Sequence, residues 1–314
     1  MKQDCLLFSL VISFFSVFAQ SPVPPPYFHP NKQLNRELLN IVHSLELDGN
    51  FDVGADGIEQ ISLAVVDLTS GPPQFAGVHA DNFIYPASVY KMYVAAEILH
   101  QISLGEIALD STIVVTFPNI VDKTKEISHD PRPLLQHGDT VTVNYLLDLM
   151  ITRSDNSAAN CLIDIAKRPR INTMLQSYGW YGSEVTRKFL SRKYEDPGYA
   201  EIRGTETCAL HAADFLYRIQ TNQLINPWVS MQMKVLLGRQ LDKSKFAQGL
   251  LRNIMYYHKT GWFSYWTHDV GIVDDGQICY IVACFLPIEE ERAVQIYPEL
   301  ARKVTEIIRS RHGL

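Results

Sequence analysis

The sequence predicts an α/β fold of the α+β type, in which strands from both ends of the chain form one antiparallel sheet with flanking helices. Two observations favour this fold: β-branched apolar runs occur near both ends, and the middle of the chain carries helical periodicity. We expect one α/β lobe from residues 32–84 and 250–314, with an inserted all-helical lobe from residues 85–249. A functional site is expected between the two lobes.

The predicted elements follow from local patterns along the chain. Leu34, Leu38 and Ile41 recur at helical spacing and predict a helix over 32–47. Further helices are predicted at 87–102, 141–152, 155–167, 170–178, 207–221, 228–238 and 297–311. Strands are predicted at 61–68, 74–78, 256–260, 267–273 and 278–286. The polar stretch between residues 179 and 207 carries no such pattern and is typical of a functional loop.

The composition is that of a globular protein. The 314 residues include 28 Lys and Arg against 34 Asp and Glu, and 46% of the residues are hydrophobic. These values exclude disordered, collagen-like and coiled-coil classes. A net charge of −6, without a basic run, argues against a nucleic-acid partner. We expect a monomer that acts on a small-molecule or peptide substrate.

The amino-terminal segment predicts export to the periplasm or the extracellular space. Residues 6–18 form an apolar run that is shorter than the roughly 17–25 residues of a membrane span. We therefore expect a signal peptide over 1–19, cleaved after Ala19, with no membrane span after cleavage. An uncleaved membrane anchor is the alternative. The Pro-rich residues 20–31 are expected to form an extended lead.

The cysteines and histidines indicate neither a metal site nor a cofactor site. Cys161, Cys208, Cys279 and Cys284 remain after the predicted cleavage and show no CxxC spacing. Buried free thiols are expected, and one disulfide remains an open alternative. The ten His residues include no HExxH motif.

Ser88 and Lys91 form the first of three short motifs, at the start of a predicted buried helix. Residues three apart share a helix face, which brings the Lys91 amine beside the Ser88 hydroxyl. A serine hydroxyl needs an adjacent base to act as a nucleophile, and a desolvated lysine with a lowered pKa is such a base. A helix-start serine with a surface lysine is the simpler alternative.

The second and third motifs each have a simple structural interpretation. Ser154-Asp155-Asn156 consists of preferred N-cap residues in front of a predicted helix. Lys259-Thr260-Gly261 ends a predicted strand at a turn glycine. The three motifs together are far more specific, since Ser154 follows Ser88 by 66 residues and Lys259 follows Ser154 by 105.

With these motifs the sequence resembles the class A serine β-lactamases and other penicillin-recognising serine hydrolases. The resemblance runs from about Leu34 to the carboxyl terminus and includes Gln136-His137-Gly138 and His258. It implies a β-lactamase/transpeptidase-like fold without a cofactor. It also implies that Ser88 is the acylated nucleophile, that Lys91 is its base or proton relay, and that Ser154 passes a proton to the leaving lactam nitrogen.

The resemblance further implies a set of substrate-binding residues. Asn156 would hold the side-chain amide of the substrate. Lys259 and Thr260, in the motif that Gly261 completes, would bind the substrate carboxylate. The backbone N–H groups of the nucleophile and of Trp262 would form the oxyanion hole.

Two departures from the class A pattern bear on the activity. Class A enzymes carry a loop Glu-x-x-Leu-Asn whose Glu activates the deacylating water, but residues 187–196 contain no such motif. Glu195 is the nearest acid and is our candidate base, with Lys91 or Glu201 as alternatives. The strand after the third motif also lacks an Arg, and His268 is a weak substitute for it.

The sequence thus favours a secreted serine β-lactam hydrolase, a class linked to antibiotic resistance. A penicillin-binding DD-peptidase acting on a cell-wall peptide is the alternative, as is a protein that binds β-lactams and deacylates slowly. The missing loop Glu favours these alternatives.

Overall fold

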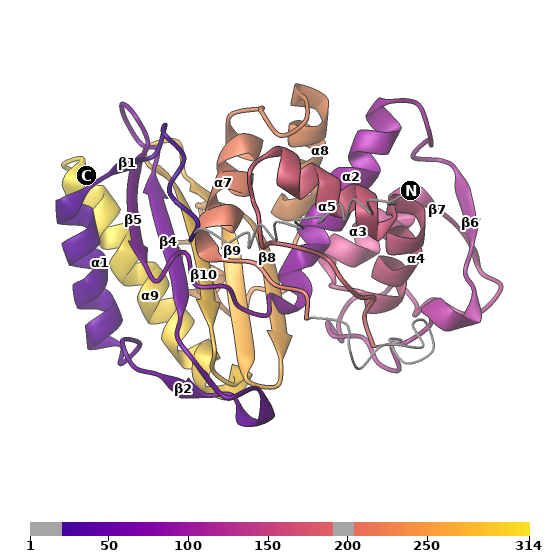
Figure 1. Cartoon of the computed structure of the whole chain (residues 1–314), viewed down its shortest axis with the longest axis horizontal. Coiled ribbons are helices and arrows are strands. Elements are labelled where there is room, and N and C mark those ends of the chain that lie inside the picture. Colours follow the sequence, from indigo (N-terminus) through magenta and orange to yellow (C-terminus); the bar gives the residue numbers. More distant parts are fainter. Residues whose placement is uncertain (1–20, 191–203) are drawn as a thin grey trace, which may run out of the picture.

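The computed structural model describes residues 21–190 and 204–314 and contains a mixed six-stranded sheet (Figure 1). The strand order is β1-β5-β4-β10-β9-β8, and only the β1–β5 pair is parallel. The strands are β1 His29–Pro30, β4 Ser62–Asp67, β5 Gln74–Val78, β8 Met255–Phe263, β9 Trp266–Asp274 and β10 Cys279–Leu286. Strands from both ends of the chain therefore form one sheet, which confirms the predicted fold class.

Two helices cover one face of the sheet, α1 (Lys32–Ser44) and α9 (Glu290–Arg311), and they lie side by side in Figure 1. Alternate strand residues such as Leu63 and Val65 point into this layer. Helix α9 begins earlier than the predicted residue 297. Glu290 and Glu291 occupy its first turn, where carboxylates stabilise the positive end of the helix dipole.

The remaining helices lie on the other side of the sheet and share one hydrophobic core with it. Ala64 and Val66, the neighbours of Leu63 and Val65, point into this core. Helix α2 is buried almost all round, as its apolar sequence predicts. The helices are α2 Lys91–Ser103, α3 Val143–Thr152, α4 Asn156–Ala166, α5 Arg168–Ser177, α7 Ala209–Gln220 and α8 Pro227–Gly238.

The start of α2 differs from the prediction. Residues Ala87–Tyr90 form a 3₁₀ turn, and the α-helix begins at Lys91. Ala87 has a φ of 44°, in the left-handed region, so the chain bends sharply just before the turn. Two short strand pairs also lie outside the prediction: β2 (Phe51–Asp52) with β3 (Ile58–Glu59), and β6 (Thr112–Val114) with β7 (Thr140–Thr142).

The Pro-rich lead packs onto the body of the protein over its described part. The Tyr27 hydroxyl donates to the Asp214 carboxylate at 2.5 Å, and the Phe28 and Phe75 rings stack with centroids 5.8 Å apart. Residues 29 and 30 then pair with β5 as an edge strand. Residues 27–30 are therefore anchored to the body of the protein, because aromatic side chains follow the prolines and find apolar partners.

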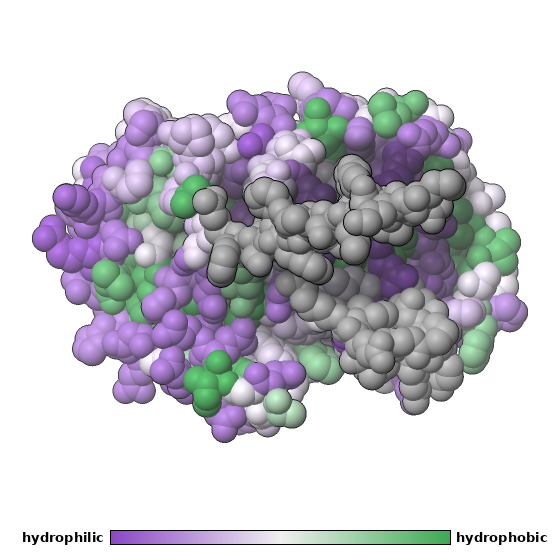
Figure 2. All heavy atoms as spheres, viewed as in Figure 1, coloured by the Kyte–Doolittle hydropathy of each residue, from purple (hydrophilic) through white to green (hydrophobic). Residues whose placement is uncertain are grey.

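Cys161, Cys208, Cys279 and Cys284 are free thiols, as expected. No helix within the described residues is long and apolar enough to cross a membrane. The face in Figure 2 shows hydrophilic residues with scattered hydrophobic groups between them. The predicted signal peptide falls on residues that the structure does not describe.

Candidate active site

Ser88 and Lys91 lie together at the junction of the 3₁₀ turn and α2. The Lys91 Nζ atom is 3.0 Å from the Ser88 Oγ atom. Ser88 is 7% exposed, and Lys91 is fully buried. The spacing argument therefore holds although Ser88 belongs to the tighter turn, since a 3₁₀ turn also aligns residues three apart.

The Lys91 amine also lies close to the second motif. Its Nζ atom is 2.6 Å from the Ser154 carbonyl oxygen, 3.2 Å from Ser154 Oγ and 2.8 Å from Asn156 Oδ1. Burial lowers the pKa of Lys91 to about 8, against the opposing effect of nearby acids such as Glu126 and Asp122. An amine with this pKa is able to accept the proton of a serine hydroxyl near neutral pH.

Ser154 occupies a strained position between α3 and α4. Its φ is 63°, a left-handed conformation that is uncommon outside glycine. The Lys259 Nζ atom donates to Ser154 Oγ at 2.9 Å, so this hydroxyl lies between two lysine amines. Non-glycine residues in this region cluster at functional sites, where surrounding contacts hold them.

Asp155 is the N-cap of α4, which is the structural role that its motif predicted. Its carboxylate accepts from the Ala158 N–H at 2.7 Å, as an N-cap of α4, and pairs with Arg153 at 2.7 Å. The motif therefore begins a helix with Asp155 and brings Ser154 and Asn156 to the lysines.

Lys259 and Thr260 reach the site from β8. Burial, with the Lys91 charge as the next cause, lowers the pKa of Lys259 to about 7. The Thr260 hydroxyl is buried and has no hydrogen-bond partner within the described residues. Because unpaired buried polar groups are costly, this hydroxyl indicates a place where a ligand supplies the missing partner.

Gly261 lets β8 approach the nucleophile closely. A Cβ atom there would lie 2.9 Å from both the Pro86 carbonyl oxygen and the Ser88 nitrogen. Any side chain would push the strand away from the turn that carries Ser88. Trp262 follows and is 43% exposed.

A cleft of about 380 Å³ opens beside these groups. The second motif, the end of β8 and the loop of residues 121–126 bound this cleft. Its lining residues are Val121, Asp122, Lys123, Thr124, Lys125, Glu126, Leu134, Arg153, Ser154, Asp155, Asn156, Leu190 and Trp262. Its volume suits a small molecule.

Asp122 is a positioning residue that the sequence analysis missed. Its carboxylate accepts from the Asn156 backbone N–H at 2.7 Å and side-chain amide at 2.8 Å, and from the Ser157 N–H at 2.8 Å. It thereby turns Asn156 Oδ1 toward Lys91. Asp122 lies in an irregular loop far from the motif in sequence, so no local pattern signals this role.

Phe189 is the second residue that sequence reasoning missed. Asn160 binds both backbone groups of this residue. The Phe189 N–H donates to Asn160 Oδ1 at 2.8 Å, and the Phe189 carbonyl oxygen accepts from Asn160 Nδ2 at 2.9 Å. Its ring stacks on Tyr90 at 4.5 Å and lies 4.3 Å from the Lys91 Nζ atom. Among the residues of this loop that the structure describes, a ring contacts the lysine.

Three sequence hypotheses concern residues near this loop and strand. Glu195 and Glu201 lie outside the described residues. His268 is fully buried, with Nε2 2.8 Å from the Tyr85 carbonyl oxygen and Nδ1 accepting from the Leu286 N–H at 3.2 Å. Both ring nitrogens are used within the fold, so the hypothesis that His268 replaces a carboxylate-binding Arg has no support in this geometry.

Comparison with known proteins places the chain in a family. The sequence model of the β-lactamase enzyme family matches residues 51–308. The extended-spectrum β-lactamase PER-1 of Pseudomonas aeruginosa is 30% identical over 97 residues, which cover 29% of this chain and 30% of that enzyme. The matched stretch thus spans less than a third of that relative.

Solved structures share the fold at low sequence identity. PBP-A superposes with a TM-score of 0.73 and 18% identity, over 93% of this chain and 100% of the other. A β-lactamase from Sphaerobacter thermophilus superposes with a TM-score of 0.72 and 19% identity, over 87% of this chain and 97% of the other. An ancestral class A β-lactamase superposes with a TM-score of 0.70 and 21% identity, over 88% of this chain and 100% of the other.

The fold is shared with PBP-A and with class A β-lactamases, and the site brings two serine hydroxyls and two lysine amines into contact. The chain belongs to the β-lactamase enzyme family.

Proposed function

We propose that this protein opens the β-lactam ring through an acyl-enzyme on Ser88. One observation carries the proposal: a buried chain of contacts joins Ser88 Oγ, Lys91 Nζ, Ser154 Oγ and Lys259 Nζ, with each step between 2.9 and 3.2 Å. These contacts would connect a nucleophile (Ser88), a base (Lys91) and a proton donor (Ser154) beside a cleft of small-molecule size.

In the proposed reaction the neutral Lys91 amine takes the Ser88 proton as the Ser88 oxygen attacks the lactam carbonyl carbon. The carbon–nitrogen bond of the ring then breaks, and Ser154 donates a proton to the leaving nitrogen. Ser154 regains its proton from Lys91. Lys259 and the unpaired Thr260 hydroxyl bind the substrate carboxylate, while Asn156 binds its side-chain amide.

The second half of the reaction is proposed to be slow. Hydrolysis of the ester on Ser88 needs a base that holds a water molecule near it. Within the described part of the loop, the Phe189 ring lies against Lys91, and a ring cannot accept a proton. This contact also favours the second candidate function, a penicillin-binding peptidase that transfers the acyl group of a cell-wall peptide.

Labelling with a fluorescent penicillin tests the nucleophile. The wild type should acquire one label, whereas Ser88→Ala should acquire none. Ser310→Ala is a control that removes an exposed serine hydroxyl on α9, away from the site, and it should retain the label. Labelling of Ser88→Ala at the wild-type rate would refute the assignment.

We also propose that the protein is exported. The apolar run in residues 6–18 supports this, and so does membership of the β-lactamase family, whose members are typically exported. Amino-terminal sequencing of the protein from its producing cells should begin at Gln20. A chain that begins at Met1 would contradict cleavage.

A further inference from the structure

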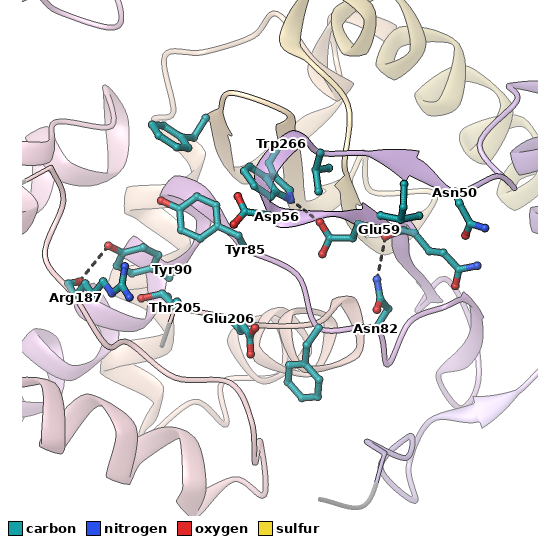
Figure 3. Close-up of a pocket in the computed structure, with 16 residues that line it drawn as sticks. Asn50, Asp56, Glu59, Asn82, Tyr85, Tyr90, Arg187, Thr205, Glu206 and Trp266 are labelled. Atoms are coloured by element: carbon teal, nitrogen blue, oxygen red, sulfur yellow. Dashed lines mark hydrogen bonds between the residues drawn. The ribbon is translucent and has the colours of Figure 1, made fainter. Parts of the chain in front are cut away.

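A second and larger pocket, of about 750 Å³, is shown in Figure 3. Trp262 lines the cleft and its neighbour Phe263 lines this pocket, as expected for successive strand residues that point to opposite faces. Tyr85 and Tyr90, on either side of Ser88 in sequence, also line it.

One wall of this pocket is an ordered aromatic cluster. The Tyr85 ring packs edge-to-face with Trp266, with centroids 5.5 Å apart, and with Phe263 at 6.0 Å. Edge-to-face packing fixes the ring orientations and gives the pocket a rigid apolar wall. Phe83 adds a further ring to the lining.

Three carboxylates line the same pocket, from Asp56, Glu59 and Glu206. The Glu59 carboxylate accepts a hydrogen bond from the Trp266 indole at 2.6 Å, which ties the acidic group to the aromatic wall. Burial raises the pKa of Glu59 to about 7, and the charges of Glu206 and Asp56 add to this effect. No ion pair joins Glu59 or Asp56 to a cationic side chain within the described residues.

We propose that this pocket binds an organic ligand with an ammonium group and an apolar body. The ammonium lies beside Glu59 and Asp56, where it neutralises these two carboxylates, and the apolar body packs against the aromatic wall. Arg187 lines the pocket toward its other end in Figure 3.

A metal ion fits this pocket less well than an organic cation. Within residues 21–190 and 204–314, no three acidic, His or Cys side chains converge closely enough to hold a metal. The pocket volume also far exceeds that of an ion, and its aromatic wall offers no oxygen ligands beyond the Tyr hydroxyls. This inference stands apart from the proposed acyl-enzyme chemistry.

Ligand-observed NMR titration of the full-length mature protein tests the inference. The probes are phenethylammonium and benzyltrimethylammonium, with phenethyl alcohol as the neutral counterpart of the first. We expect saturable binding of the ammonium probes and at least tenfold weaker binding of the alcohol. Absence of binding by both ammonium probes, or equal affinity for the alcohol, would overturn the inference.

Two variants locate the binding. Glu59→Gln keeps an oxygen that accepts from the Trp266 indole, and Asp56→Asn alters an exposed loop residue, so both should fold. Each should weaken phenethylammonium binding at least tenfold, whereas Glu291→Gln on the exposed start of α9 should not. Wild-type affinity in Glu59→Gln and in Asp56→Asn would place the probe elsewhere and refute the site. Penicillin labelling of Ser88 in the same variants reports separately on the proposed function.

Discussion

Two buried amines meet at one hydroxyl in this active site. Lys91 and Lys259 both contact Ser154 Oγ, and burial lowers the pKa of each. The two positive charges also repel each other, so the site favours the loss of one proton. In the free protein the pKa of Lys259, about 7, is below that of Lys91, about 8, so Lys259 loses its proton first. A bound substrate carboxylate would raise the pKa of Lys259, and the proton would then be lost from Lys91, which gives the neutral amine that a base requires.

The acylation rate is therefore expected to rise with pH. Below its pKa of about 8, Lys91 is mostly protonated and cannot accept the Ser88 proton. Single-turnover acylation at saturating benzylpenicillin should increase roughly 50-fold from pH 6 to pH 8 and level off above about pH 9, since the neutral fraction of Lys91 rises over this range. Lys91→Arg, which keeps the charge but cannot lose its proton, should show no such rise and should acylate at least roughly 100-fold more slowly than the wild type at pH 9. A flat wild-type profile would move the base role to another group.

At the scale of elements, the loop after α5 is held firmly where it meets α2 and α4. Asn160 binds both backbone groups of Phe189, Lys188 pairs with Asp164 at 2.5 Å, and the Tyr90 hydroxyl donates to the Arg187 carbonyl at 3.3 Å. The backbone at residue 189 is thus fixed independently of its side chain. A different side chain there should point toward Lys91 as well.

We therefore expect Phe189→Glu to speed hydrolysis of the acyl-enzyme by at least tenfold, since it places a carboxylate base beside Ser88 and Lys91. The rate of product release after a single acylation measures this step. Phe189→Gln has nearly the same shape without a basic carboxylate and should remain slow. Equal deacylation rates for the Glu and Gln variants would show that position 189 does not control this step.

The elements themselves were largely predictable because their patterns are local. The periodic apolar residues of α1 predict a helix. The β-branched runs of β4 and β10 predict strands. The contact of Phe189 with Lys91 and that of Asp122 with Asn156 were not predictable, because each joins segments that only the tertiary fold brings together. The 3₁₀ turn at Ser88 escaped prediction for a similar reason: β8 packs against it through Gly261.

At the scale of the whole molecule, buried histidines link stability to pH. His211 and His268 have pKa values lowered to about 4, and that of His258 is also lowered, chiefly by burial. The unfolded chain, with His pKa values near 6.5, binds more protons between about pH 4 and 6.5. Stability should therefore fall as the pH decreases through this range, by at most roughly 1.4 kcal/mol per pH unit for each of His211 and His268.

Thermal denaturation at pH 7 and pH 5 measures this effect. The melting temperature of the wild type should be lower at pH 5, and His211→Gln should reduce the difference. His43→Gln removes an exposed histidine and should not reduce it. A pH-dependent loss that is unchanged in His211→Gln would show that this histidine is not a source of the effect.

The central claim, a Ser88 acyl-enzyme that forms quickly and hydrolyses slowly, is tested most directly by intact-mass spectrometry. The protein is mixed with excess benzylpenicillin and sampled from seconds to hours. The account predicts that the wild-type mass rises rapidly by one benzylpenicillin and stays raised after free drug is removed, while Ser88→Ala keeps its original mass. A wild-type mass that never rises, with no drug consumed, would contradict the account, as would rapid drug consumption without accumulation of the adduct.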